Sequence, residues 1–206
     1  SSLKNHHNCH HIFKGEYFMR YKTGYKEQRR KELLHISGQI GKKNGFAATG
    51  VDAFMKASGV TSGAFYSHFS SKNDLFKALL ENELQNSIQM WQDNPFEDAE
   101  QWIEFELNRY LSLSHVERPD YGCVLPALAS EVARSDLQLK QTYQAELMRG
   151  QQIFKHHLGS EEKAWAVLCQ LIGAIIMARS IADENLKQTI LTSSKALILS
   201  CLKSVA

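Results

Sequence analysis

Apolar residues along this chain recur with the period of an α-helix rather than with the strict alternation of a β-strand. The first such segment begins near Lys26 and ends at Asn44-Gly45, a pair that commonly terminates helices. Its apolar face is formed by Leu33, Leu34, Ile36 and Ile40. Gly38 and Gly41 interrupt this segment, and each costs about 1 kcal/mol of helix propensity relative to alanine. We therefore expect this helix to be locally soft.

Eight further helices follow from the same periodicity and from residues that start and stop helices. Gly59 separates the first two of them, and Ser71, Asp136 and Ser160 are suitable N-caps for later ones. The predicted helices cover Val51–Ala57, Thr61–Phe69, Lys72–Trp91, Glu97–His115, Leu125–Arg134, Leu137–His157, Glu161–Ala182 and Asn185–Lys203. The pattern predicts an all-α protein of about nine helices.

The composition agrees with a helical protein that stays outside the membrane. No run of about 18 uncharged apolar residues is present, and the first residues lack the apolar stretch of a signal peptide. The four cysteines, Cys9, Cys123, Cys169 and Cys201, form no C-x-x-C pair. We interpret them as reduced thiols of a cytoplasmic protein, and we expect no membrane partner.

Charge is distributed unevenly around the small net value of +2. The segment from Arg20 to Phe76 contains ten Lys and Arg against four Asp and Glu, which gives +6. The segment from Lys77 to Ala206 contains twelve against seventeen, which gives −5. A basic N-terminal segment and an acidic C-terminal segment indicate that the N-terminal segment contacts a polyanion.

Residues 1–24 show little periodic apolar pattern and are predicted to form a flexible N-terminal segment. Four histidines and a cysteine lie between His6 and His11, and these are residue types that bind metals. Because no second pair follows at ligand spacing, we expect no metal site. A tag remnant, or sequence upstream of a start at Met19, explains this stretch better.

The stretch from Gly45 to Leu75 has the layout of a helix-turn-helix. Phe65 and Phe69 lie four residues apart and face inward on its second helix. The opposite face presents small, hydroxyl-bearing and aromatic residues: Thr61, Ser62, Gly63, Ala64, Tyr66, Ser67 and His68. Small residues allow the backbone to approach base edges, and hydroxyls bond bases or phosphates. This helix is therefore predicted to enter the major groove of double-stranded DNA.

The stretch resembles the TetR family of bacterial transcriptional regulators (TetR/AcrR-type). The resemblance rests on Leu33, Leu34, Gly45, Val51, Phe54, Ala57, Gly59-Val60-Thr61, Gly63, Tyr66, His68-Phe69, Lys72 and Leu75. It implies an N-terminal three-helix DNA-binding domain over residues 25–85. It also implies a helical effector-binding and dimerisation domain over residues 86–206.

The resemblance also implies roles for individual residues in the DNA-binding domain. Ser62, Gly63 and Tyr66 match base-contacting positions of the family. Phosphate-contacting positions are matched by Ala64, Ser67, His68 and Lys72. Thr49 is a further candidate phosphate contact, and Thr61 is expected to cap the recognition helix first and to contact DNA second.

The helices that the family uses around its ligand cavity supply candidate pocket residues. These are Trp102, Phe105, Tyr110, Cys123, Leu128, Trp165, Cys169 and Met177, although aromatic and methionine stripes are more often plain core. The segment from Ala164 to Ala182 is apolar nearly all round and must be buried on most sides. We expect it and the final helix to form the interface of a homodimer.

Patterns typical of enzymes are weak in this sequence. The stretch from Gly41 to Gly45 lacks the phosphate-loop pattern, and no paired carboxylates or metal-ligand set stands out. We therefore expect no catalytic residues and no cofactor. The leading hypothesis is a repressor released from a palindromic operator by a small, largely apolar ligand. The alternative is a helix-turn-helix regulator that is gated by a protein partner or constitutively bound, without a small-molecule ligand.

Overall fold

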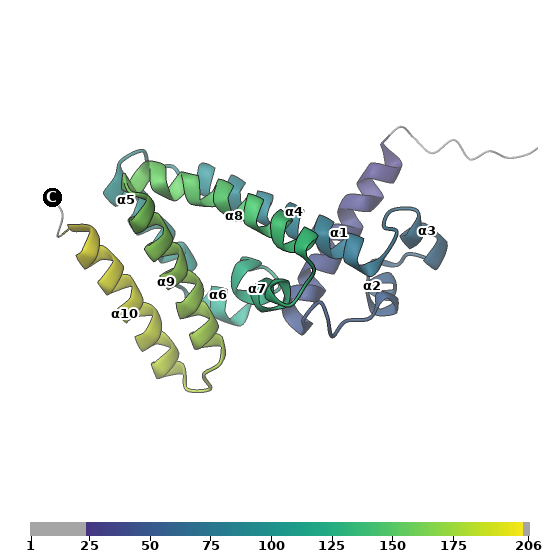
Figure 1. Ribbon diagram of the computed structural model, residues 1–206. Helices are drawn as coiled ribbons and strands as arrows, with labels where there is room; N and C mark the ends of the chain where they lie inside the picture. Colours follow the sequence, from purple (N-terminus) through teal and green to yellow (C-terminus); the bar gives the residue numbers. More distant parts are fainter. Residues whose placement is uncertain (1–23, 204–206) are drawn as a thin grey trace, which may run out of the picture.

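The computed structural model describes residues 24–203, which form ten helices and no β-strand (Figure 1). They are α1 (Tyr25–Asn44), α2 (Val51–Ser58), α3 (Ser62–Tyr66), α4 (Lys72–Gln92), α5 (Ala99–Tyr110), α6 (Leu113–Glu117), α7 (Leu125–Ala133), α8 (Leu137–Leu158), α9 (Glu161–Arg179) and α10 (Glu184–Lys203). The all-α prediction is confirmed. The predicted flexible segment, with its histidine cluster, lies outside the described residues except for Gly24.

The predicted N-caps start three of the long helices. The hydroxyl of Ser71 accepts a hydrogen bond from the Asp74 N–H at the start of α4. The Asp136 carboxylate does the same for α8, and the Ser160 hydroxyl does so for α9. Each cap satisfies an N–H group that has no partner within the helix. The residues at which these three helices start were therefore predictable from the capping side chains alone.

Two helices differ from the prediction. The single helix expected over Glu97–His115 is divided into α5 and α6, because Leu111 leaves helical geometry and the Ser112 hydroxyl caps a new helix by accepting from the His115 N–H. The third helix ends at Tyr66, where the Ser67 hydroxyl donates to the Ala64 carbonyl at 2.7 Å. Serine side chains that bond nearby backbone compete with helix continuation. The division of one helix raises the count from about nine to ten.

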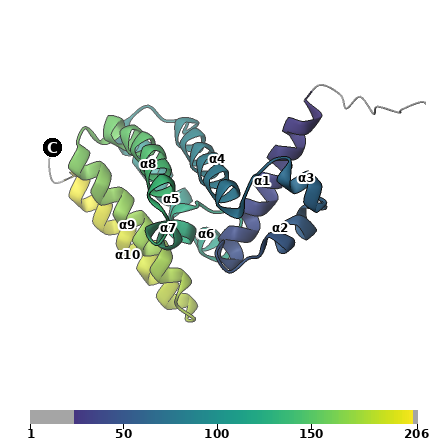
Figure 2. The same cartoon turned by 45° about the vertical axis from the view of Figure 1, so that its right-hand side comes forward.

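The helices form two groups joined by α4. In Figure 1, α1, α2 and α3 lie at one end, and the paired helices α9 and α10 lie at the other. Helix α4 runs from the first group along α8 into the second, and Figure 2 shows α5 to α10 grouped beside it. No helix within residues 24–203 is both long and apolar enough to cross a membrane.

Aromatic side chains fill the core at both ends of α4. Near its start, Phe46 stacks between Phe54 and Phe76, with ring centroids 5.1 and 4.2 Å apart. Near its end, the Trp91 ring packs edge-on against Phe154 of α8, 5.1 Å away. A Cβ atom on Gly150 of α8 would lie 2.6 Å from the Trp91 ring, so glycine is what allows α8 this close to α4. A movement of α4 therefore displaces packed side chains in both cores.

Candidate nucleic-acid interface and effector cavity

Helices α2 and α3 form a helix-turn-helix whose turn is built from Gly59, Val60 and Thr61. Gly59 adopts a φ of 61°, a left-handed conformation that glycine reaches without strain. The Thr61 hydroxyl then caps α3 by accepting from the Ala64 N–H. Phe65 and Phe69 are buried, as predicted, and they fix α3 against the core. The rest of α3 consequently faces outward.

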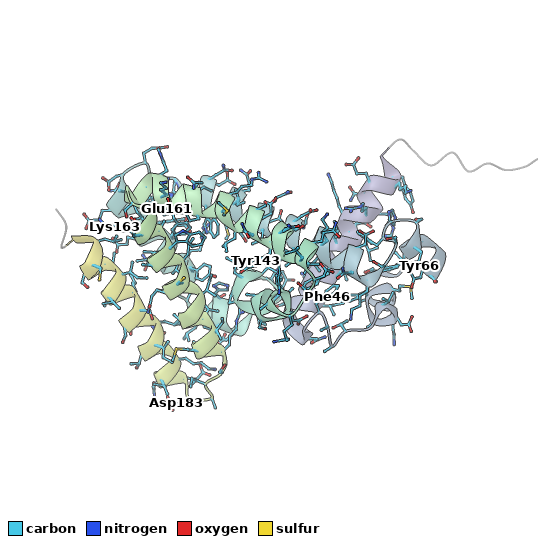
Figure 3. All side chains as sticks on the ribbon, in the orientation of Figure 1. Phe46, Tyr66, Tyr143, Glu161, Lys163 and Asp183 are labelled. Carbon is cyan, nitrogen blue, oxygen red and sulfur yellow. The ribbon has the colours of Figure 1, made fainter. Side chains whose placement is uncertain are left out.

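The outward face of α3 carries most of the predicted DNA contacts. Thr61, Ser62, Gly63 and Ser67 are exposed, and Ala64 and His68 are half-buried. The Tyr66 side chain is 53% exposed and lies at the outer edge of the molecule (Figure 3). Its ring contacts Phe65 edge-on, with centroids 5.2 Å apart, so the exposed phenol packs against a buried neighbour.

Two of the predicted phosphate contacts also make internal contacts. Thr49 is buried, and its hydroxyl donates to the Gly45 carbonyl at 2.7 Å. The Lys72 ammonium donates to the Ala47 carbonyl at 2.9 Å and lies 5.3 Å from the centroid of the Phe46 ring. Both side chains therefore stabilise the connection between α1 and α2. Sequence position alone could not separate this role from phosphate binding, because both need a residue near a helix start.

Basic residues from the start of α1 surround the recognition helix. A groove of about 440 Å³ separates the two elements, and Lys26 and Arg29 line it opposite Thr61, Ser67 and His68. Burial lowers the pKa of His68, and the positive charges of Lys26, Arg30 and Arg29 lower it further. His68 is consequently neutral near pH 7, and the positive potential comes from α1. Sequence analysis did not single out Arg29, since only the fold brings it beside α3.

These features define a class of protein, the helix-turn-helix DNA-binding proteins. Residues 42–79 match the family model described as bacterial regulatory proteins, tetR family. That stretch carries the DNA-binding region of the family, and residues 24–203 adopt the fold of TetR-family structures. The resemblance predicted from the Gly45–Leu75 stretch is confirmed. The match is to regulatory proteins rather than to enzymes.

Individual relatives agree with this family. The HTH-type transcriptional activator FasR of Mycolicibacterium smegmatis is 32% identical over 63 residues, which are 31% of this chain and 29% of that protein. The structure of E. coli NemR in its reduced form is 18% identical and has a TM-score of 0.72, with 86% of this chain and 96% of that one covered. The structure of Bacillus subtilis FadR in complex with stearoyl-CoA is 17% identical with a TM-score of 0.60, over 84% and 96% of the two chains.

The second group of helices contains two adjoining cavities of about 180 Å³ each. Both are lined by Met90, Tyr121, Gly122 and Cys123. The first continues between α5 and α6, and its further lining residues are Arg109, Tyr110, Ser112, Ser114, His115 and Arg118. The second continues toward α1, and its further lining residues are His35, Gln39, Lys42, Glu83, Asn86, Ser87 and Asp120.

Only some of the predicted pocket residues lie at the two cavities. Cys123 lines both cavities, and Tyr110 lines the first. Trp102 and Leu128 are buried, and Phe105 and Trp165 are half-buried, and none of the four lines either cavity. Cys169 and Met177 are exposed on α9, and Met177 is 59% exposed. Periodicity placed all eight on helices, but it could not say which face of α9 meets a neighbour.

His115 organises the wall of the first cavity. Its Nδ1 donates to the Tyr110 carbonyl at 2.8 Å, and its Nε2 accepts from the Cys123 N–H at 3.1 Å. Burial lowers the pKa of His115 to about 4, and the positive charges of Arg179, Lys42 and Arg109 act in the same direction, against the bond to Tyr110. A neutral ring is required for Nε2 to accept this bond. His115 therefore connects α5, α6 and the segment at residues 118–123.

A buried ion pair connects these cavities to the DNA-binding helices. The Lys42 ammonium of α1 donates to the Glu83 carboxylate of α4 at 2.6 Å and to the Gly122 carbonyl at 3.0 Å. A Cβ atom on Gly38 would lie 2.5 Å from the Glu83 carboxylate. Gly38 is thus the residue that lets the carboxylate reach Lys42, rather than a weak point of α1.

A second connection reaches the same region from α7. The Glu131 carboxylate accepts hydrogen bonds from the N–H groups of Phe46 and Ala47 at 2.9 and 2.6 Å. These groups lie in the segment between α1 and α2, next to the Gly45 carbonyl that Thr49 uses. Charge-assisted bonds of this kind are stronger than neutral ones. Gly122 and Glu131 of the second group of helices therefore hold α1 and the start of the helix-turn-helix.

Breaking the Lys42–Glu83 pair on one side should strongly destabilise the protein. Lys42→Met leaves a buried carboxylate without its partner, which costs about 3–5 kcal/mol, whereas Lys42→Met combined with Glu83→Met should recover most of that loss. Urea denaturation measures both variants. Lys155→Met, which breaks an exposed pair with Glu161, is the control and should cost less than about 1 kcal/mol. A double variant as unstable as the single one would contradict this account.

Stability should also depend on pH through His115. Its pKa when folded, about 4, lies below the value of 6.5 that is usual for a histidine, so the unfolded chain binds more protons between these values. The contribution of His115 to stability is complete above pH 6.5 and is lost as the pH falls toward 4. Urea midpoints across this range should fall less steeply in His115→Gln. Burial also lowers the pKa values of His68 and His157, so the difference between parent and variant isolates His115.

Proposed function

We propose that this chain is a transcriptional repressor that binds a palindromic operator as a homodimer and is released by a small molecule. Residues 25–85 form the DNA-binding domain, and residues 86–206 form the effector-binding and dimerisation domain. The observation that carries this proposal is the bond from Lys42 of α1 to the carbonyl of Gly122, a residue that lines both cavities. A ligand that displaces the segment at residues 118–123 acts directly on the DNA-binding helices.

The DNA-binding part rests on the exposed face of α3. We assign base contacts to the exposed Ser62, Gly63 and Tyr66. We assign phosphate contacts to Ser67 and His68, which lie beside the basic start of α1. Thr61 caps the helix and remains exposed, and Ala64 offers a methyl group for contact. Small and hydroxyl-bearing residues permit close approach of the helix N-terminus to the groove.

Removing the exposed aromatic group of α3 should weaken specific DNA binding. Tyr66→Ala combined with His68→Ala should reduce operator affinity at least about tenfold, since a base contact contributes roughly 1–3 kcal/mol. The operator is selected from a random-sequence library, and affinity is measured by fluorescence anisotropy. Leu137→Ala, which removes an even more exposed apolar side chain from α8, is the control and should have no effect. Unchanged affinity in the double variant would show that α3 is not the helix that enters the major groove.

The dimerisation part rests on an exposed apolar face of α9 and α10. Cys169, Gly173 and Met177 follow one another at four-residue spacing on α9, and Ile176 lies beside them. Leu186 and Leu197 are exposed on α10. Apolar surface of this extent marks an interaction site. A twofold dimer through these helices presents two α3 helices to the two halves of a palindrome.

A charge placed on this face should dissociate the dimer and leave the protomer folded. A Cβ atom on Gly173 meets nothing within 4 Å in the protomer, so Gly173→Glu is tolerated there, but in a dimer it buries an unpaired charge. Light scattering should give the 23.4 kDa protomer for this variant and twice that mass for the parent. Ala145→Glu, an exposed position on α8, is the control and should remain dimeric. A parent protein that is monomeric at micromolar concentration would refute the interface.

Release from DNA follows from two features. Helix α4 runs through both groups of helices, and the bonds of Lys42 and Glu131 join the same two groups. A ligand in the cavities displaces Gly122 and α6, so Lys42 loses one of its two acceptors and the start of α4 is free to tilt. To lower operator affinity tenfold to a hundredfold, the ligand must prefer the tilted arrangement by about 1.4–2.8 kcal/mol. Gating by a protein partner, the alternative, would be favoured by a solid effector domain, and the two cavities count against it.

A further inference from the structure

The groove between the start of α1 and α3 brings two cations to the recognition helix. The two helices lie at the same end of the molecule in Figures 1 and 2, and Lys26 and Arg29 line the groove opposite Ser67 and His68. Lys26 is exposed and Arg29 is half-buried. Among the residues that line the groove, none is acidic. An anion that enters this groove of about 440 Å³ therefore meets cations without a competing carboxylate in the wall.

Arg29 has hydrogen-bonding groups left for such an anion. Its one side-chain hydrogen bond within the described residues runs from Nη1 to the Glu32 carboxylate at 2.6 Å. A guanidinium group has five N–H donors in a planar fork, so Nε and Nη2 remain for a second acceptor. The pair with Glu32 is partly exposed, and such pairs are weak. The neighbouring Arg30 is placed differently, because its guanidinium group lies over the Phe69 ring, 4.7 Å from the centroid, and does not line the groove.

His68 adds a neutral donor to the same groove. Its Nδ1 atom is buried and has no hydrogen-bond partner among the described residues. Burial lowers the pKa of His68, and the positive charges of Lys26, Arg30 and Arg29 lower it further. A proton on Nδ1 would create a buried N–H group without an acceptor, which is unfavourable. The ring therefore stays neutral and carries its proton on Nε2, the nitrogen that is left to contact an anion.

We infer that a phosphate of the operator backbone lies in this groove, where it accepts hydrogen bonds from Lys26, Arg29 and His68 Nε2. This inference rests on the proposed DNA-binding function and adds two residues of α1 to its DNA contacts. Charge-assisted bonds to phosphate are stronger than neutral ones, and the planar fork of arginine matches phosphate oxygens. Phosphate contacts fix the orientation of a protein on the duplex. Lys26 and Arg29 are therefore positioning residues for α3 and do not read the base sequence.

The test neutralises the phosphates of the DNA one at a time. The operator selected from a random-sequence library is synthesised with a single methylphosphonate, which removes the charge of one phosphate, and the affinity of the full chain is measured by fluorescence anisotropy. One neutralised phosphate in each half-site should weaken binding of the parent at least about fivefold. The same change should leave a variant with both Lys26→Gln and Arg29→Gln unaffected, because this variant has already lost the contact. Its salt slope should also be smaller by about one per protomer.

Lys31→Gln is the matched control. Lys31 is exposed on α1, two residues after Arg29, and does not line the groove, so this variant loses a charge outside the inferred contact. It should respond to every neutralised phosphate as the parent does. The urea midpoints of both variants should match that of the parent, since Arg29 gives up only a partly exposed ion pair.

The role of His68 has its own readout. Nitrogen NMR spectra of the operator complex, recorded near pH 7 with labelled histidine, should show a His68 ring with one proton, on Nε2. The His68→Gln variant assigns the signals. A ring that is protonated on both nitrogens in the complex would overturn the assignment of His68 as a neutral donor.

The outcomes distinguish this inference from the function on which it rests. A double variant that responds to every neutralised phosphate as the parent does would overturn the phosphate site and leave specific DNA binding by α3 intact. A Lys31→Gln variant that loses the same response would overturn it too, because the effect would then come from charge in general. A parent protein that selects no operator sequence would contradict the proposed function itself.

Discussion

The structure depends on one buried ion pair, that between Lys42 and Glu83. Burying two charges is unfavourable unless both are paired and their remaining hydrogen-bonding groups are satisfied. Here the remaining demand of the ammonium is met by the Gly122 carbonyl. A single side chain thereby joins α1 of the DNA-binding domain, α4 and the wall of both cavities. Any rearrangement of the cavity wall must keep these bonds or lose a large part of the stability that they maintain.

Close packing at glycine makes this arrangement possible. Gly38 leaves space for the Glu83 carboxylate, and Gly150 leaves space for Trp91. A Cβ atom on Gly122 would lie 2.5 Å from the His115 ring. Packed contacts of this kind have few intermediate positions, so displacement of one partner requires displacement of the other. The three glycines therefore lie where α4 meets α1, where α4 meets α8 and where the cavity wall meets α6.

Charge around the two cavities is arranged differently from charge beside α3. Around α3 the cations Lys26 and Arg29 stand at a solvent-filled groove, where phosphates can reach them. Around the cavities Lys42 is paired with Glu83 and Arg109 with Glu106, and the exposed Arg118 lies 3.5 Å from Asp120. The first arrangement suits a long polyanion, whereas the second consists of ion pairs within the protein.

The sequence by itself determined the helical class, most helix starts and the DNA-binding motif, because these depend on spacing and on caps within a few residues. Ser71, Asp136 and Ser160 act as caps where local chemistry predicted them, and Phe65 and Phe69 are buried as their spacing required. Only the tertiary structure decided the partners of Lys42, Glu131 and Arg179, which lie 41 to 85 positions from the residues they bond. Such contacts leave no periodic signal, since any buried charge needs a partner but its own neighbours in sequence do not say which one.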